Sequence, residues 1–300
     1  TPMKVSGRTV SCWNRELSLG ENGFFKQIGS GQQELLSRPI QLEAHSDGKS
    51  LDWRGNGVRF GKSTEGAVDF TATSSCAKIK ADIACHSEFD GMFQYTVKLT
   101  PQGDGKVDGL DLVVPLKEDN AWLLHATSDG CRSNASLFTP SGEGRVWDST
   151  LVQQWRLTGT FIPYLWLGSD RGGLCWWADS EKGWVRPTER KSPAIEVRRQ
   201  KGEVQMVFHL IARPFQLKEP RTIVFAFNAT PVRPRPSWAR SWTNISGKAD
   251  GFLKGPHVRV DGSCSWVSFG KDSLPDRSYT YASLRPISDE ADTWLKDYLA

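Results

Sequence analysis

The sequence predicts an all-β fold, a two-layer antiparallel β-sandwich, on the basis of three observations. Apolar and polar side chains alternate at every second position in several segments, which places one set on a core face. Turn-forming pairs of Gly with Asp, Asn or Lys separate these segments, in a chain that holds 28 Gly and 16 Pro. No helical pattern of about ten residues occurs before residue 240. The short, turn-like spacers favour antiparallel sheets packed face to face over parallel strands joined by helical crossovers.

The predicted strands continue to about residue 230. The alternation is clearest where Tyr95, Val97 and Leu99 alternate with polar residues, and it recurs over 204–210 and 223–228. Gly and Asp in the intervening turns supply the positive backbone angles that hairpins require. These turn signals lie at 46–48, 56–57, 90–91, 103–105, 128–130 and 201–202.

A proline-rich segment marks the end of the predicted sandwich. The stretch 230–236 contains three prolines, which cannot donate to the hydrogen-bond ladder of a sheet interior and which favour an extended connection. We therefore expect the sandwich to occupy residues 1–240.

The remaining residues, 241–300, are predicted to form a linker followed by one strand and one helix. A strand is expected around 257–266, and Ser288 begins a segment whose apolar residues fall at helical spacing. One strand and one helix cannot bury their own apolar faces. The sequence therefore predicts a truncated second domain that continues beyond Ala300, the start of a larger unit.

Composition and motifs disfavour several classes of function. The 38 Lys and Arg against 34 Asp and Glu leave a formal charge of +4, without the basic clusters typical of nucleic-acid binding. The chain contains no stretch of about 18 apolar residues of the kind that spans a bilayer. No phosphate-binding loop, dinucleotide fingerprint or zinc-type spacing of the six cysteines is found. We expect no cofactor, no metal, no nucleic-acid partner and no membrane span.

Tryptophan is unusually abundant and concentrated. The chain has 13 Trp against 5 Tyr, and six of the Trp lie between residues 147 and 184. A flat indole can stack on the C–H face of a sugar, or it can fill a core or a seam between domains. Trp166, Trp177 and Trp184 flank predicted turns, so they are the candidates for contact with substrate or with a neighbouring domain.

The segment around these tryptophans resembles a known family. FIPYLWLGSDRGGLCWWADSEKGW (161–184) is similar to the characteristic segment of the N-terminal β-sandwich domain of glycoside hydrolase family 123 and its relatives. Further similarity is carried, in the same order, by VDGLDLVVPL (107–116), GRVWDS (144–149), IEVRRQKGEVQMVFHLIARPFQL (195–217) and TIVFAFNATPVRPRP (222–236). The resemblance extends over roughly 1–240.

The resemblance implies a larger enzyme. In this family a catalytic (β/α)₈ barrel follows the sandwich, so the strand and helix expected after residue 256 would be the first barrel unit. The parent would be a retaining, exo-acting hydrolase of β-linked N-acetylgalactosaminides in which the substrate's acetamido oxygen is the nucleophile, assisted by an adjacent Asp-Glu pair. An extracellular or periplasmic location is likewise implied only by the resemblance.

The only Asp-Glu dipeptide in the chain is Asp289-Glu290. It directly follows Ser288, where a helix N-cap and two acids in the first turn are favoured by the helix dipole. Catalytic residues of a barrel lie instead at the C-terminal ends of its strands. We therefore expect no catalytic residue in this chain and place the catalytic acids beyond residue 300.

Three functional hypotheses follow. The first is a non-catalytic β-sandwich that supports the catalytic barrel of a family 123-like glycoside hydrolase, the barrel being its main partner. The second is a stand-alone carbohydrate-binding module with exposed Trp as its binding face. The third is a polysaccharide lyase with its site on the sandwich. Substrate identity, the true termini, disulfides, oligomeric state and direct contact with sugar are left open by the sequence.

Overall fold

The computed structural model describes residues 2–127, 134–152, 160–187 and 192–232, together with three short strands between 258 and 280. The chain divides into two compact units, Thr1–Arg233 and Pro234–Ala300. The boundary between the units falls inside the proline-rich segment 230–236.

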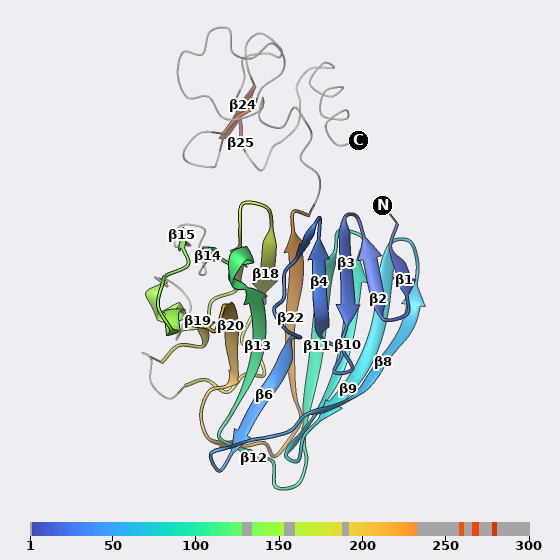
Figure 1. Ribbon diagram of the computed structural model, residues 1–300, viewed down its shortest axis with the longest axis vertical. Helices are drawn as coiled ribbons and strands as arrows, with labels where there is room; N and C mark the ends of the chain where they lie inside the picture. The colour runs from blue at the N-terminus through green and yellow to red at the C-terminus, as the bar shows by residue number, and fades with distance from the viewer. Residues whose placement is uncertain are drawn as a thin grey trace. The chain divides into compact units, whose positions relative to one another are not determined.

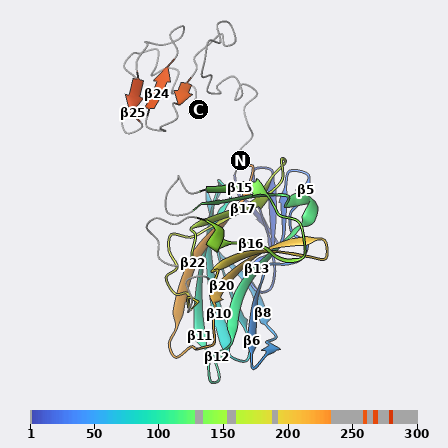
Figure 2. The ribbon, with the colours of Figure 1, turned by 90° about the vertical axis from the view of Figure 1, so that its left-hand side faces the viewer.

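The first unit is a sandwich of antiparallel sheets, as the sequence predicts (Figure 1). One layer is a nine-stranded sheet. The opposite layer consists of a six-stranded and a five-stranded sheet. Figure 2 views the layers from the side, with β22 and β11 (Arg221–Thr230 and Met92–Pro101) in one and β20 and β13 (Glu203–Ile211 and Gly109–Lys117) in the other.

The strands are given in spatial order within each sheet. The nine-stranded sheet contains β15 (Asn134–Phe138), β14 (Leu123–Thr127), β17 (Tyr164–Gly168), β18 (Gly173–Trp177), β22, β11, β10 (Ile79–Glu88), β9 (Ala67–Ser75) and β8 (Arg54–Ser63). The six-stranded sheet contains β16 (Gly144–Asp148), β19 (Ile195–Gln200), β20, β13, β6 (Gln41–Ser46) and β7 (Lys49–Ser50). The five-stranded sheet contains β1 (Lys4–Ser6), β2 (Thr9–Cys12), β3 (Arg15–Leu19), β4 (Phe25–Ser30) and β5 (Gln33–Glu34). A small ribbon pairs β12 (Lys106–Val107) with β21 (Phe215–Gln216), and two short 3₁₀ turns, η1 (Glu118–Asn120) and η2 (Ser149–Leu151), complete the described elements of this unit.

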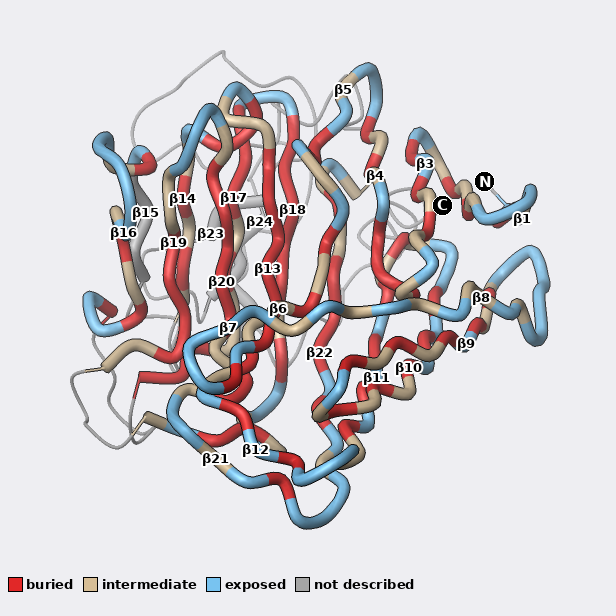
Figure 3. Tube along the Cα trace, turned by 60° about the horizontal axis from the view of Figure 1, so that its bottom comes forward, coloured by how far each residue is buried: buried red, intermediate tan, exposed pale blue. Residues whose placement is uncertain are grey.

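Aromatic side chains fill the space between the layers. Under the five-stranded sheet, the Phe25 ring meets those of Phe93 and Tyr95 edge-on, with centroid separations of 5.0 and 5.9 Å. Under the six-stranded sheet, Trp176 stacks on Phe208 at 4.2 Å. Figure 3 shows the strands that face this core as largely buried. Burial of these rings provides much of the apolar stabilisation that holds the two layers together.

The alternation predicted from the sequence is confirmed in β11. Tyr95, Val97 and Leu99 are fully buried, whereas Thr96 and Lys98 between them are exposed. This strand pairs with β10 and β22 on its two sides, so the pattern follows from one face packing on the core and the other facing outward.

Most predicted turns within the described residues are confirmed, and one is wrong. Asp47-Gly48 and Lys201-Gly202 connect β6 to β7 and β19 to β20, and all four residues have positive φ, between 48° and 78°. Asn56-Gly57, in contrast, lies inside β8, where the register with β9 shifts between Gly55 and Val58. Gly57 has φ 84° there. The Asn-Gly signal correctly indicated a positive φ, but that angle serves a β-bulge instead of a chain reversal.

In the second unit the structure describes an antiparallel sheet of three short strands, β23 (Val258–Val260), β24 (Trp266–Phe269) and β25 (Ser278–Thr280). The strand expected around 257–266 overlaps β23. The helix expected from Ser288 lies outside the described residues, and assignment of this unit as the start of a barrel stays a prediction. Within the described part of the chain, no helix is long and apolar enough to cross a membrane.

Candidate functional site

Of the three tryptophans predicted as candidates, Trp166 and Trp177 lie on one face of a sheet, whereas Trp184 is buried. In the β17–β18 hairpin, Trp166 lies opposite Cys175 and Tyr164 lies opposite Trp177. These four side chains therefore share one face, the outer face of the nine-stranded sheet. Trp176 points the other way and is fully buried, because consecutive residues of a strand face opposite sides of the sheet.

The half-buried Trp166 lies against the backbone of its own hairpin. Its Nε1 donates a hydrogen bond to Thr230 Oγ1 at 3.0 Å, which ties β17 to the end of β22. A Cβ at Gly173 would lie 2.9 Å from Trp166 Cε2, and one at Gly168 would overlap the same ring. The hydrogen bond to Thr230 thus fixes the ring against Gly168 and Gly173, where a side chain would overlap it. A fixed, partly exposed indole is suited to stacking on a flat apolar ligand.

The same outer face continues toward the edge of the sheet. His125 lies opposite Trp166, and its ring meets that of Tyr164 edge-on at 5.3 Å. At the edge strand β15, Phe138 is 72% exposed and stacks on Trp122, which is 39% exposed, with the centroids 5.9 Å apart. We call this surface the outer aromatic face, and it consists of Trp122, His125, Phe138, Tyr164, Trp166 and Trp177.

Sequence reasoning missed Trp122 and Phe138. Neither flanks a Gly-containing turn of the kind used to select candidates, and only the strand register brings them together. Trp122 immediately precedes β14, and its carbonyl oxygen accepts a hydrogen bond from Thr139 N at 2.9 Å. This pairing at the end of the β14–β15 ladder positions the two rings.

Trp184 lies in the interior of the first unit. It is 7% exposed, and its ring meets Phe161 at 5.6 Å and Trp176 at 6.2 Å. The next residue, Val185, donates to Leu210 O and accepts from Ala212 N, so this segment is fastened to the end of β20. The proximity of Trp184 to a turn therefore did not imply exposure, because long-range backbone pairing draws the segment against the core.

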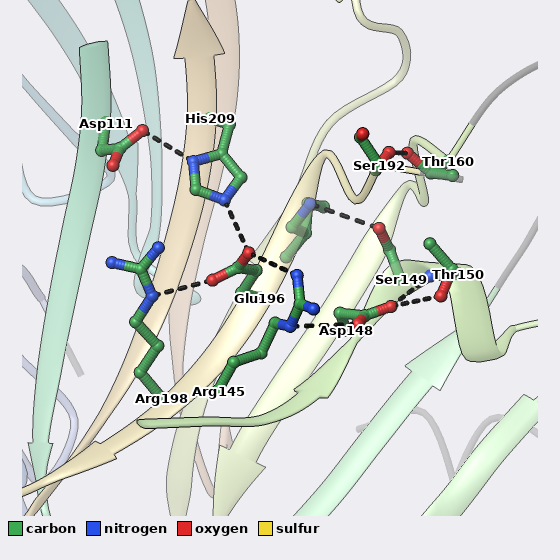
Figure 4. A network of polar contacts seen from close by, with 11 residues as sticks. Asp111, Arg145, Asp148, Ser149, Thr150, Thr160, Ser192, Glu196, Arg198 and His209 are labelled. Carbon is green, nitrogen blue, oxygen red and sulfur yellow. Dashed lines mark hydrogen bonds and ion pairs between the residues drawn. The ribbon is translucent and has the colours of Figure 1, made fainter. Parts of the chain in front are cut away.

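A second candidate site is a network of charged groups on the outer side of the six-stranded sheet (Figure 4). His209 on β20 bridges two carboxylates, with Nδ1 at 2.7 Å from Asp111 and Nε2 at 3.3 Å from Glu196. Glu196 also accepts hydrogen bonds from Arg198 at 2.7 Å and Arg145 at 3.3 Å. The residues come from four adjacent strands, β13, β20, β19 and β16.

The electrostatics of this network keep its central groups charged. Burial alone would raise the pKa of Glu196, but hydrogen bonds and charges from His209 and Arg198 outweigh it and lower that pKa to about 2. Burial alone would lower the pKa of His209, yet hydrogen bonds to Asp111 and Glu196, with their charges, raise it to about 9. At neutral pH an imidazolium therefore lies between two carboxylates, and both of its nitrogens are occupied.

Such an arrangement is poorly suited to general base catalysis. A base needs a free acceptor and a pKa near the working pH, whereas His209 is protonated and Glu196 is a very weak base. The positive charges of His209, Arg145 and Arg198 are matched by Glu196, Asp111 and Asp148, the last of these 3.5 Å from Arg145. No local sequence pattern indicates this cluster, because His209 and Asp111 are 98 residues apart.

Comparison with known protein families identifies the chain. A family model described as "Glycoside hydrolase 123, third domain" matches residues 3–190. The chain belongs to this family. The match confirms the relationship that the sequence resemblance indicated, whereas the order of this glycoside hydrolase 123 domain within a longer protein stays a prediction. No curated protein matches the sequence.

Several solved structures are similar to this glycoside hydrolase 123 domain. Alpha-N-acetylgalactosaminidase NagBb from Bifidobacterium bifidum is 12% identical with a TM-score of 0.45, and the match covers 78% of this chain and 37% of that one. A galactose mutarotase related enzyme from Lactobacillus acidophilus is 9% identical with a TM-score of 0.36, covering 75% and 97%. A heparan sulfate lyase HepC mutant from Pedobacter heparinus is 10% identical with a TM-score of 0.39, covering 91% and 38%. This chain thus spans little more than a third of the first of these proteins, and such distant similarity does not transfer their activities.

Proposed function

We propose that this chain is a non-catalytic β-sandwich domain of a glycoside hydrolase 123 protein, which supports a catalytic barrel acting on β-linked N-acetylgalactosaminides. The catalytic acids would then lie in a part of the protein beyond residue 300, and the barrel would be the main partner of the sandwich. Membership of a family whose model is described as a third domain supports a multidomain parent.

The main support for a non-catalytic role is that the positive and negative side chains around His209 are paired with one another. They form the most densely connected ionisable cluster of the described residues, and its carboxylates are committed to Arg145, Arg198 and His209. Hydrolysis by acid–base chemistry requires a carboxyl or imidazole group that can exchange a proton near neutral pH. A network locked in its charged form is better explained as a link between strands.

The first prediction concerns activity. We expect residues 1–300 to show no turnover of a chromogenic N-acetyl-β-galactosaminide above the uncatalysed rate. We expect a protein extended through the downstream reading frame to hydrolyse it and to contain barrel strands and an Asp-Glu pair. Release of the chromophore, followed by absorbance, measures both. Turnover by residues 1–300 that Glu196→Gln abolishes would refute the non-catalytic role.

A second candidate function, direct binding of carbohydrate, is favoured by the outer aromatic face. Large aromatic rings that remain exposed and stacked on each other, as Trp122 and Phe138 do, are unusual on a surface without a partner. An exposed indole offers a flat apolar face to the C–H side of a pyranose and an N–H to its hydroxyls. The half-buried Trp166 and Trp177 on the same face would extend the contact surface.

The second prediction tests this binding. If the face binds N-acetylgalactosamine, Trp122→Ala should weaken the affinity by about tenfold to a hundredfold, because burial of one large side chain contributes roughly 1.5–3 kcal/mol. Titration followed by NMR chemical shifts measures the affinity. Phe89→Ala is the matched control, since Phe89 is also an exposed aromatic, at 51%, but lies in the β10–β11 turn. Equal affinity of wild type and Trp122→Ala would exclude sugar stacking at this position.

A further inference from the structure

A shallow pocket of about 460 Å³ in the first unit has walls rich in positive charge. Three arginines, Arg186, Arg213 and Arg221, line it together with the ring of Phe215. The pocket is bounded by the segment after Trp184, the connection from β20 to β21, and the beginning of β22. Neither the family match nor the proposed function assigns a role to these residues.

Backbone carbonyl groups hold two of the guanidinium groups in place. Arg221 donates from one terminal nitrogen to Gly183 O at 3.3 Å and to Trp184 O at 3.5 Å. Arg213 donates from Nε to Arg186 O at 3.2 Å. These hydrogen bonds use one nitrogen of each group, out of the five N–H donors that a guanidinium carries. Both side chains are thus oriented and still have donors for a ligand.

The aromatic ring brings the two positive charges together. The guanidinium carbons of Arg213 and Arg221 lie 5.9 and 5.0 Å from the centre of the Phe215 ring. Cation–π attraction partly offsets the repulsion between them. Among the described residues, the carboxylate paired in this region is that of Glu181, which bonds Arg186. The contacts of Arg213 and Arg221 within the described residues are to carbonyl groups and to the Phe215 ring, so a bound anion would compensate their positive charges.

The walls of the pocket also indicate the kind of anion. Beside the arginines they include the apolar side chains of Val185, Pro187 and Phe215. The volume of about 460 Å³ falls within the range of small-molecule sites and far exceeds that of a bare inorganic ion. Guanidinium groups pair with carboxylate and sulfate-like oxygens through parallel hydrogen bonds.

We propose that this pocket binds an acidic monosaccharide, whose carboxylate or sulfate group is held by Arg213 and Arg221 while its carbon skeleton contacts the apolar wall. The neutral hydroxyl groups would face the open side. This assignment does not rest on the proposed accessory role, since either a supporting domain or a binding module could present such a site.

The third prediction is the test of this pocket. Residues 1–300 are titrated calorimetrically at low ionic strength with galacturonate, with a sulfated galactose and with neutral galactose. We expect at least one acidic sugar to bind, galactose to bind at least about tenfold more weakly, and added salt to weaken the acidic sugar further. Inorganic sulfate should compete, but with lower affinity than the acidic sugar.

Two variants make the assignment specific. Arg213→Gln should weaken binding of the acidic sugar about tenfold, and Arg221→Lys, which keeps the charge but loses the planar fork, should weaken it less. Lys98→Gln is the control, because it removes one positive charge from an exposed position on β11. Absence of binding, equal binding of galactose, or an equal effect of Lys98→Gln would overturn the site. Sulfate binding as tight as that of the acidic sugar would overturn the assignment to a saccharide.

Discussion

Replacing Glu196 with glutamine is expected to lower the free energy of unfolding by about 2–3 kcal/mol near pH 6, because it removes one partner of a buried, paired charge. The Glu196 side chain is only 8% exposed and contacts His209, Arg198 and Arg145. The amide is nearly isosteric, so the change removes charge with little loss of packing. His209 would then lie beside one carboxylate instead of two.

The effect should depend on pH in a defined way. The pKa of His209 is raised from 6.5 to about 9, so its stabilising contribution is complete below pH 6.5 and is lost as the pH rises toward 9. The pKa of Glu196 is lowered from 4.5 to about 2, so its contribution is complete above pH 4.5 and is lost as the pH falls toward 2. The two shifts share one ion pair and must not be added. The difference between wild type and Glu196→Gln should therefore be largest between pH 4.5 and 6.5.

Urea unfolding from about pH 4 to pH 9 measures this difference. His86→Gln is the control, because His86 also pairs with a carboxylate, Asp69 at 2.6 Å, but its side chain is 46% exposed. An exposed pair contributes about 0–1 kcal/mol, so His86→Gln should change stability much less than Glu196→Gln. A difference between wild type and Glu196→Gln that stays constant across this pH range would refute the coupling of Glu196 to His209.

Trp176→Ala is expected to destabilise the first unit by about 3–5 kcal/mol, whereas Trp177→Ala should cost about 1 kcal/mol or less. Trp176 is fully buried between the layers and stacks on Phe208 at 4.2 Å, so its removal leaves a large cavity. Trp177, the next residue, is half-buried on the outer face, where the surrounding side chains and water can fill the space. Consecutive positions in one strand make this a closely matched pair.

Thermal and urea unfolding of the two variants measure the contrast, and sugar titration gives a second comparison. If Trp177 contacts carbohydrate, its alanine variant should lose affinity while it keeps its stability, and Trp176→Ala should show the reverse at temperatures where it remains folded. Similar destabilisation by both substitutions would contradict the placement of the two rings on opposite faces of β18.

Much of the fold was predictable because its signals are local. The alternation at Tyr95, Val97 and Leu99 specified a strand with one buried face, and the Gly-containing pairs at 47–48 and 201–202 specified hairpins. The limit of such signals is shown by Asn56-Gly57. A dipeptide that favours positive φ fits both a turn and a bulge, and pairing with β9 decides between them.

The candidate sites were only partly predictable. The sequence predicted Trp166 and Trp177 as contacts for a substrate or a neighbouring domain, which stays a prediction, and the strand register places both on the outer face of the nine-stranded sheet. The sequence did not indicate that Trp184 is buried or that Trp122 stacks on Phe138. Exposure of an aromatic ring depends on which distant strands pack against it, and a turn nearby carries no information about that.

The amino-acid sequence alone specifies the strand periodicity, most of the turns within the described residues and the relationship to glycoside hydrolase 123, because each depends on residues close together in the chain or on motif order. The packing of distant strands establishes which aromatic rings reach the surface, that His209 bridges two carboxylates, and that Arg213 and Arg221 share one ring. These arrangements depend on strand order and register across sheets. Residues far apart in sequence become neighbours only when the layers pack, so no local pattern could specify them.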